Sequence, residues 1–450
     1  MGLDPDRSAA GVRGALAGIG APPPHRRAQR PLLRRLHLRL PPAAAAGGLG
    51  CHVGSRVLGI LCGVRGGDPA RRLALVDPDR EAGVEPQGAG PVTARPPGGS
   101  TRGDRSTEGC QRATLGSRLS SHANALNAIR LLLAAAVILG HTVPVGGYPE
   151  SAWQNASGTA VNGFFTISGY LIAGSRMRLS LRAFLWRRAL RLFPAFWVSL
   201  AVTAAVIAPV SALLSGETVV PGSALAYVVA NATLYITQWD IQHLLTSVPY
   251  PDVWNGSLWT LWYEAAAYIA AGLLLTLPWA RRRPLTWISL AFVLVALLQF
   301  ASSEPVDLSA TKLFQGFRLG GFFLAGMLLW AARNRVPLRW WLAVPSLLLT
   351  YASQTWPEPF GWFAVAIPFA YGLLWLGAVL PVRLGSVNDL SYGTYIYAFP
   401  VQQLLAVAGA HTVLGYWGFA TVALLVTLVF AWLSWHLVEK PTLRLKSAVS

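Results

Sequence analysis

Hydrophobic runs of about 20 residues, the length that crosses a membrane, recur along residues 120–450 and are separated by short polar loops. The runs lie near 127–145, 158–175, 192–212, 258–280, 285–301, 312–332, 338–354, 361–380, 391–410 and 418–437. They predict an all-α fold, an integral membrane bundle of about ten transmembrane helices. An eleventh apolar run, 223–237, is short and carries Asn231, so we expect it to be re-entrant or interfacial.

The positive residues between the runs predict how the chain crosses the membrane. If the ten runs span, sixteen of the nineteen Lys and Arg residues in 121–450 fall on one side, and the opposite loops hold mainly acids. Cytoplasmic loops are enriched in Lys and Arg. We therefore expect a multi-pass protein of the cell inner (plasma) membrane, surrounded by lipid, with both termini in the cytoplasm.

Residues 1–118 differ in composition: they are rich in Arg, Pro, Gly and Ala and show no helical or strand periodicity. Two interpretations stay open, a disordered basic tail or an over-extended start site. No aromatic residue lies between the arginines, so we expect no nucleic-acid partner. All three cysteines (Cys51, Cys62 and Cys110) lie in this stretch at spacings that match no metal site. The predicted membrane domain is therefore 119–450.

Ionisable residues inside membrane spans are rare and are functional candidates. Arg130 and His141 are 11 residues apart in the first span, which places them on one helical face about 16 Å apart. Glu264 is the only carboxylate clearly inside a span. Structural alternatives remain open for each: Arg130 reaching the membrane surface, His141 ending a helix, and Glu264 pairing with Arg318.

Six short motifs, in order along the chain, resemble those of acyltransferase family 3, bacterial membrane enzymes that acylate sugars, polysaccharides and related acceptors. The motifs are Arg130 with His141, FFTISG at 164–169, RR-x-x-R at Arg187, Arg188 and Arg191, SLWTLWYE at 257–264, SYGTYIYAFPVQ at 391–402, and VEKP at 438–441. The likeness covers about 122–445. One departure is Ala398, where many members of the family have His.

The resemblance implies a membrane O-acyltransferase that uses a cytoplasmic acyl-CoA donor, expected to be acetyl-CoA, and no tightly bound cofactor. The acceptor would be a hydroxyl of a carbohydrate or glycosylated molecule at or beyond the outer face. His141 would act as a general base or carry the acyl group itself.

The remaining candidate residues fall into three sets. Arg130 and Glu264 would complete the catalytic group with His141. The set expected to bind the donor is Arg187, Arg188 and Arg191. The set expected to contact substrate is Ser168, Gly169 and Trp259, although Trp259 also fits an interfacial tryptophan belt and the Ser168–Gly169 pair fits close helix packing.

Two alternatives to an enzyme deserve comparison. A transporter or flippase of an anionic or glycan substrate would also have many spans and buried charges. The chain lacks paired Gly/Pro-interrupted helices in corresponding halves, which would favour an inverted-repeat transporter. A non-catalytic scaffold would not need Arg130, His141 and Glu264.

Overall fold

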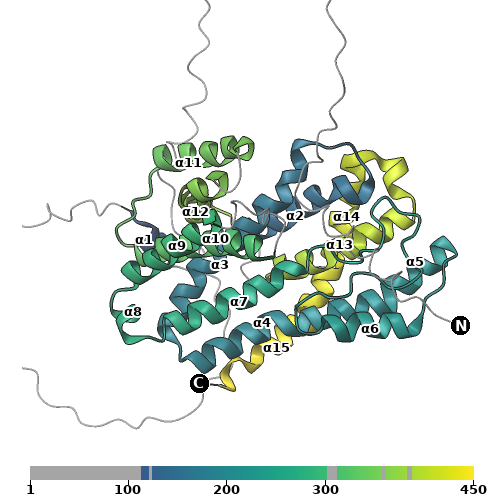
Figure 1. Cartoon of the computed structure of the whole chain (residues 1–450), viewed down its shortest axis with the longest axis horizontal. Coiled ribbons are helices and arrows are strands. Elements are labelled where there is room, and N and C mark those ends of the chain that lie inside the picture. Colours follow the sequence, from purple (N-terminus) through teal and green to yellow (C-terminus); the bar gives the residue numbers. More distant parts are fainter. Residues whose placement is uncertain (1–112, 121–123, 302–311, 357–359, 383–387, 450) are drawn as a thin grey trace, which may run out of the picture. The chain divides into compact units, whose positions relative to one another are not determined.

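The computed structural model describes residues 113–120, 124–301, 312–356, 360–382 and 388–449 (Figure 1). These residues belong to one unit. The predicted tail up to residue 112, with its three cysteines, and the loop arginine Arg383 lie outside the described residues.

The described residues form helices and short helical turns, with no strand among them. The helices are α1 (Leu115–Leu119), α2 (Leu126–Gly146), α3 (Ala156–Arg178), α4 (Leu181–Val202), α5 (Ala208–Ser215), α6 (Pro221–Asn231), α7 (Trp259–Leu274), α8 (Pro278–Arg282), α9 (Pro284–Ala301), α10 (Lys312–Ala331), α11 (Trp340–Ala352), α12 (Phe360–Val379), α13 (Ser391–Val407), α14 (Ala410–Ser434) and α15 (Lys440–Thr442). A π-helical turn, Thr203–Ile207, joins α4 to α5, and another, Trp435–Glu439, follows α14.

Helix α3 is central to the bundle, since it packs against α2, α7, α10 and α12. Glycines allow its close approach to α10. A Cβ at Gly169 would collide with the carbonyl of Phe323, and a Cβ at Gly326 would collide with the carbonyl of Thr166. Small residues at facing positions are how membrane helices come into close van der Waals contact.

Each of the ten predicted spans coincides with a helix, but only six stretches in the described part of the chain are long and apolar enough to cross a membrane. Those stretches are Leu126–Gly146, Leu181–Ser215, Pro284–Ala301, Lys312–Ala331, Phe360–Val379 and Ala410–Ser447. Helices α7, α11 and α13 have 16, 13 and 17 residues, and a span needs about 20. Helix α3 has 23 residues but many polar ones. The count of ten spans therefore stays a prediction.

The eleventh apolar run overlaps the short helix α6, which has 11 residues and so rises about 16 Å. Asn231 ends the helix, because its side chain donates to the carbonyl of Gln238 at 2.7 Å and accepts from the amide of Thr237 at 2.9 Å. The chain then continues without regular helix to α7. A helix of this length cannot span a bilayer, but its position relative to the membrane stays a prediction.

The described part of the chain begins at residue 113, a few residues before the predicted boundary at 118. Thr114 caps α1 by accepting from the amide of Ser117. Leu115 is fully buried, and its amide donates to the carbonyl of Val336 at 3.0 Å. Residues 114–116 therefore contact the residues that follow α10, while the boundary at 118 stays a prediction.

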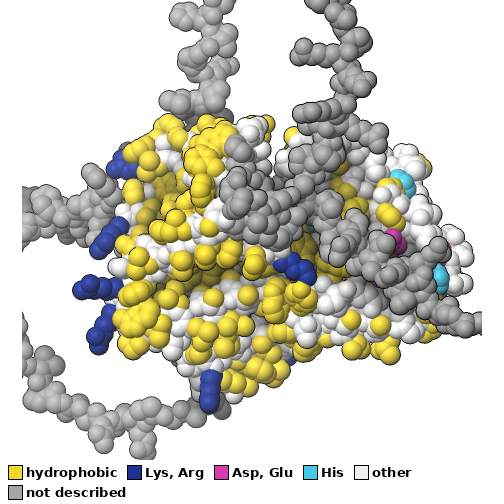
Figure 2. Space-filling view, in the orientation of Figure 1, with side chains coloured by type: hydrophobic (Ala, Val, Ile, Leu, Met, Phe, Trp, Pro, Cys, Tyr) yellow, Lys and Arg dark blue, Asp and Glu magenta, His cyan; other side chains and the backbone are white. Residues whose placement is uncertain are grey.

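Apolar side chains cover most of the visible face in Figure 2. Lys and Arg gather at the edge near α8 and α1, and Asp, Glu and His appear near α5 and α14 at the opposite edge. Large apolar residues are strongly exposed, among them Leu213 and Val413 at 84% and 82%. Soluble monomers rarely expose apolar surface so extensively, whereas lipid accommodates it.

Candidate active site

A cavity of about 70 Å³ lies between helices α2, α3, α4, α7 and α13. Apolar residues of α3, such as Phe164 and Leu171, form much of its wall. Its polar lining consists of Arg130, Ser168, Arg188, Arg191, Thr260, Glu264, Tyr268, Ser391, Tyr392 and Tyr395. The structure thus brings together four of the predicted charged residues: Arg130, Arg188, Arg191 and Glu264.

Glu264 is bound by two hydroxyl groups inside the cavity. Ser168 Oγ donates to Glu264 Oε1 at 3.2 Å, and the hydroxyl of Tyr268 donates to the same oxygen. Glu264 and Tyr268 are four residues apart on α7, so they share a helical face, and Ser168 faces them from α3. The alternative partner considered for Glu264, Arg318, instead lies over the ring of Trp362 at 5.1 Å.

Two arginines of the cavity lining, Arg130 and Arg191, belong to an ion-pair network. Arg130 Nη1 donates to Asp389 Oδ2 at 3.0 Å, and Arg191 Nη2 donates to the same oxygen at 2.6 Å. Arg191 Nη1 also donates to Glu439 Oε2 at 3.1 Å. Four elements therefore meet here: the first turns of α2, the middle of α4, the residue pair before α13 and the π-helical turn after α14.

Asp389 is held in this network from both sides of its carboxylate. Its Oδ1 accepts from the hydroxyl of Ser391 at 2.6 Å and from the amide of Ser391 at 3.2 Å. Burial alone would raise the pKa of Asp389, but the guanidinium groups of Arg130 and Arg191 hold it well below its usual range. The Asp389 carboxylate is therefore ionised throughout the neutral pH range.

Arg188 lies between aromatic rings, unlike Arg191. Its Cζ atom is 5.9 Å from the ring centres of both Phe184 and Tyr268. Its Nε is buried and has no hydrogen-bond partner among the described residues. Arg187, the adjacent arginine of the same motif, does not line the cavity.

His141 lies outside the cavity lining, three turns further along α2 than Arg130. Its ring meets the ring of Phe399 edge-on, with centres 5.1 Å apart. Its Nδ1 is buried and makes no hydrogen bond within the described part of the chain. The predicted Arg130–His141 pair thus shares a helix, but only Arg130 reaches the cavity.

Residues 123–436 match the acyltransferase domain that defines acyltransferase family 3. The chain belongs to this family. Membership makes the protein a membrane acyltransferase, which decides between the enzyme and the transporter or scaffold alternatives.

Two relatives of this acyltransferase family 3 member are similar along nearly their whole lengths. The chain is 28% identical to a protein of Shigella phage Sf6 named O-acetyl transferase, over 70% of this chain and 95% of that protein. It is 26% identical to Nodulation protein 10 of Rhizobium leguminosarum bv. viciae, over 73% of this chain and 96% of that protein. These likenesses support O-acyl transfer. No solved structure matches the chain at comparable significance.

The predicted substrate-contacting residues of this acyltransferase occupy three different settings. Ser168 lines the cavity. Gly169 faces α10, where its missing side chain permits helix contact with Phe323. Trp259 stays outside the cavity lining, with its ring edge-on to Tyr263 at 5.6 Å. A role for Gly169 or Trp259 in substrate contact stays a prediction.

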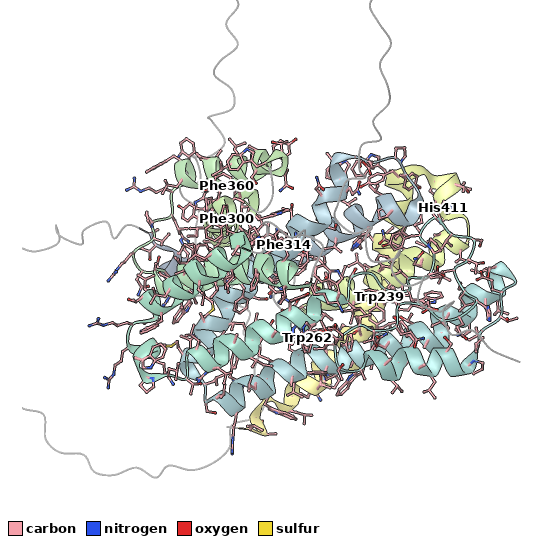
Figure 3. The ribbon with its side chains drawn as sticks, in the orientation of Figure 1. Trp239, Trp262, Phe300, Phe314, Phe360 and His411 are labelled. Carbon is pink, nitrogen blue, oxygen red and sulfur yellow. The ribbon has the colours of Figure 1, made fainter. Side chains whose placement is uncertain are left out.

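Other tryptophans in and just before α7 also differ from one another. Trp254 is fully buried, whereas Trp262 of α7 is 43% exposed and is labelled in Figure 3 together with Trp239, which precedes α7 in the chain. Trp262 meets Tyr235 edge-on at 5.5 Å. An exposed aromatic pair of this kind is typical of the membrane interface.

Sequence reasoning missed several residues of this acyltransferase site, chiefly Asp389 and Tyr268. Tyr268 had a detectable signal, because it lies one helical turn after Glu264. Asp389 had only a weak one, as an acid on the side of the membrane where basic residues predominate. Ala398, the departure from the family pattern, is buried against Ile138 of α2.

Proposed function

We propose that this membrane O-acyltransferase transfers an acetyl group from cytoplasmic acetyl-CoA to a hydroxyl of a carbohydrate or glycosylated acceptor at or beyond the outer face of the inner membrane. The observation that carries the proposal is the cavity in which Arg130, Arg188 and Arg191 lie with Glu264. The similarity to a protein named O-acetyl transferase supports acetyl as the acyl group and oxygen as the acceptor atom.

The arginines favour an anionic donor. Guanidinium groups bind phosphate oxygens with two parallel hydrogen bonds, and an acyl-CoA carries several phosphate oxygens on a long thin arm. Of the three arginines that line the cavity, Arg188 makes no hydrogen bond to the described residues. An acyl-CoA would thus place its phosphates at the arginines of the cavity and extend its arm along α2 towards His141.

The distribution of charge supports the proposed orientation. Lys and Arg gather near α8 and α1, on the edge opposite most of the visible acids (Figure 2). By the excess of positive residues in cytoplasmic loops, the basic edge would face the cytoplasm. Both termini would then be cytoplasmic and the arginine-rich end of the cavity would face the acyl-CoA pool.

His141 is our proposed general base. The acceptor O–H would lose its proton to His141 as its oxygen bonds to the acyl carbon. The thioester C–S bond would then break, and the CoA thiolate would take up the proton, giving an ester and free CoA. The unpaired Nδ1 of His141 supports this role, and displacement of the Phe399 ring would expose it. A transient acyl-His is the alternative.

Glu264 would orient groups within the cavity through Ser168 and Tyr268, which both donate to it. It is also the alternative base, because it lines the cavity directly and His141 does not. Glu264→Gln keeps the shape of the side chain and removes its basicity, so it separates the two assignments from each other when compared with His141→Ala.

The test is acetyl transfer in inverted membrane vesicles, whose cytoplasmic face is outward, from cells that carry the native acceptor. Radiolabelled acetyl-CoA is expected to label a glycan fraction, and mass spectrometry of surface glycans with and without the gene would identify the acceptor. Vesicles that contain the protein but release no CoA and incorporate no label would contradict acetyl-CoA as the donor.

A further inference from the structure

Asp389 occupies a junction between two arginines that the family motifs treat as separate. Its Oδ2 accepts from Arg130 at 3.0 Å and from Arg191 at 2.6 Å, although these arginines lie on α2 and α4. The side chains of Arg130, Arg191 and Asp389 are only 18%, 15% and 16% exposed. Because the carboxylate is also bound by Ser391, its position is determined independently of either arginine.

Arg191 has little capacity left for a substrate anion. One terminal nitrogen is bound to Asp389 and the other to Glu439, which is itself 3% exposed. Its Cζ also lies 5.5 Å from the ring centre of Tyr392. Two carboxylates facing one guanidinium neutralise its charge and occupy its planar fork. An incoming phosphate would have to displace a buried acid to bind there.

Arg188 is in the opposite state. It lines the same cavity, yet no hydrogen bond joins it to the described residues, and its near neighbours are the faces of Phe184 and Tyr268. The nearby acid Glu264 is bound instead by Ser168 and Tyr268. A guanidinium desolvated between rings and left with free N–H groups is suited to bind an anion.

We propose that Asp389 is a positioning residue that fixes Arg130 by bridging it to Arg191, and that Arg188 is the arginine of the motif that binds the anionic part of the donor. The inference rests on the proposed acyl-CoA donor and assigns different roles to the charged residues of the donor site. Arg191, Asp389 and Glu439 form the frame, that frame holds Arg130 in place to contact the donor, and Arg188 binds phosphate.

The division predicts opposite kinetic signatures for two single variants in the inverted vesicles described above. Arg188→Gln should raise the KM for acetyl-CoA about 10- to 100-fold, the range expected for losing hydrogen bonds to a charged group, with kcat within about threefold. Asp389→Asn should lower kcat about 10- to 100-fold, because a small misplacement of a catalytic group has effects of this size. Its KM should stay the same or fall, because it leaves positive charge uncompensated.

Matched variants separate these effects from a general loss of charge or fold. Arg335→Gln removes an exposed arginine that does not line the cavity and should leave both constants unchanged. Ser391→Ala removes a hydrogen bond from Asp389 but keeps its charge, so it should lower kcat in the same direction as Asp389→Asn and by less. All rates are divided by the amount of folded protein measured by size exclusion in detergent.

The outcomes distinguish this inference from the proposed function. If the unaltered protein does not consume acetyl-CoA, the donor assignment fails and the inference fails with it. If it does, and Asp389→Asn raises KM while kcat is unchanged, or Arg188→Gln lowers only kcat, the division of labour is overturned and the donor assignment stands. A Ser391→Ala enzyme with unaltered kcat would also contradict the positioning role of Asp389.

Discussion

Helix α2 carries a largely buried polar side chain near each end, Arg130 and His141. Other residues of the protein bind the first and do not bind the second. Arg130 is bound to a carboxylate that is itself bound by a second arginine and a serine. His141 has a buried Nδ1 with no hydrogen bond to the described residues and an aromatic ring against its edge. An unpaired buried polar group costs about 1–3 kcal/mol, so its presence calls for an explanation.

The difference indicates at which end of α2 the protein's own residues satisfy the hydrogen-bonding groups. The Arg130 end is assembled from the chain's own charges and needs no ligand to be satisfied. The His141 end is unsatisfied until a hydroxyl or another polar group reaches it. We therefore expect changes at the Arg130 end to affect stability and donor geometry, and changes at the His141 end to affect chemistry alone.

The largest expected effect is from His141→Ala. A positioned general base contributes about 10²–10⁴-fold in rate, so acetylation per folded molecule should fall by that factor. The amount of folded protein should not change, because the imidazole Nδ1 makes no hydrogen bond to lose. The measurement is label incorporation in vesicles, normalised to membrane protein.

His411 offers a matched control for this substitution. It lies at the start of α14 (Figure 3), and its Nδ1 is likewise buried without a hydrogen bond to the described residues. His411→Ala should leave normalised acetylation unchanged. If His141→Ala retains near-normal normalised activity, His141 is not the general base, and Glu264 becomes the better candidate.

The second effect is on stability, at the Arg130 end. Arg191→Gln removes the partner of two buried carboxylates, and breaking a buried pair costs about 3–5 kcal/mol. The thermal unfolding temperature in detergent should fall markedly, and that of Arg335→Gln should not. The double variant Arg191→Gln, Glu439→Gln should recover much of the loss, because Asp389 keeps Arg130 as its partner and no buried carboxylate is left unpaired. No recovery in the double variant would contradict a charge-based frame.

The third effect compares neighbouring residues on α3. Gly169→Val should lower the yield of folded protein, because its side chain would collide with the carbonyl of Phe323, and overpacking costs about 1–3 kcal/mol. Ser168→Ala should leave the yield normal and lower activity, because Ser168 donates to Glu264 inside the cavity. If instead Gly169→Val lowers activity at normal yield and Ser168→Ala lowers the yield, the side of α3 that carries Gly169 would be the side that faces the substrate.

Periodicity along the chain predicted the helices well, because lipid and the core both select apolar residues at regular spacing. Each predicted span coincides with a helix. The spans were harder to count, because α7, α11 and α13 are shorter than a full span and α3 carries many polar residues.

The site was predicted only as far as local motifs extend. The spacing of Arg130 and His141 determines that they share a helix, but it does not determine what packs beside them. Asp389 is 259 residues from Arg130 in the chain, and no local pattern connects the two. The setting of Gly169 also depends on the approach of α10, which only tertiary packing determines. Contacts between helices that are distant in the sequence therefore could not be predicted from the sequence.

The smallest expected effect is on the pH profile, and it tests the two ends of α2 together. A general base must be unprotonated, so activity should fall on the acid side as His141 gains a proton. Asp389 should not contribute to this limb. Its ordinary pKa is 3.8, and in the folded protein the pKa is held lower by Arg130 and Arg191, after burial has acted in the opposite direction. A depressed pKa of this kind contributes stability that is fully present above about pH 4 and is lost only as the pH falls further.

Asp389→Asn should therefore lower the height of the profile and leave the midpoint of its acid limb within about 0.3 pH units, because the nearest charge to His141 on α2 is about 16 Å away at Arg130. A limb that moves with Asp389→Asn would place the titrating group in the ion-pair network at the Arg130 end, and His141 would then no longer be the group that limits the rate at low pH.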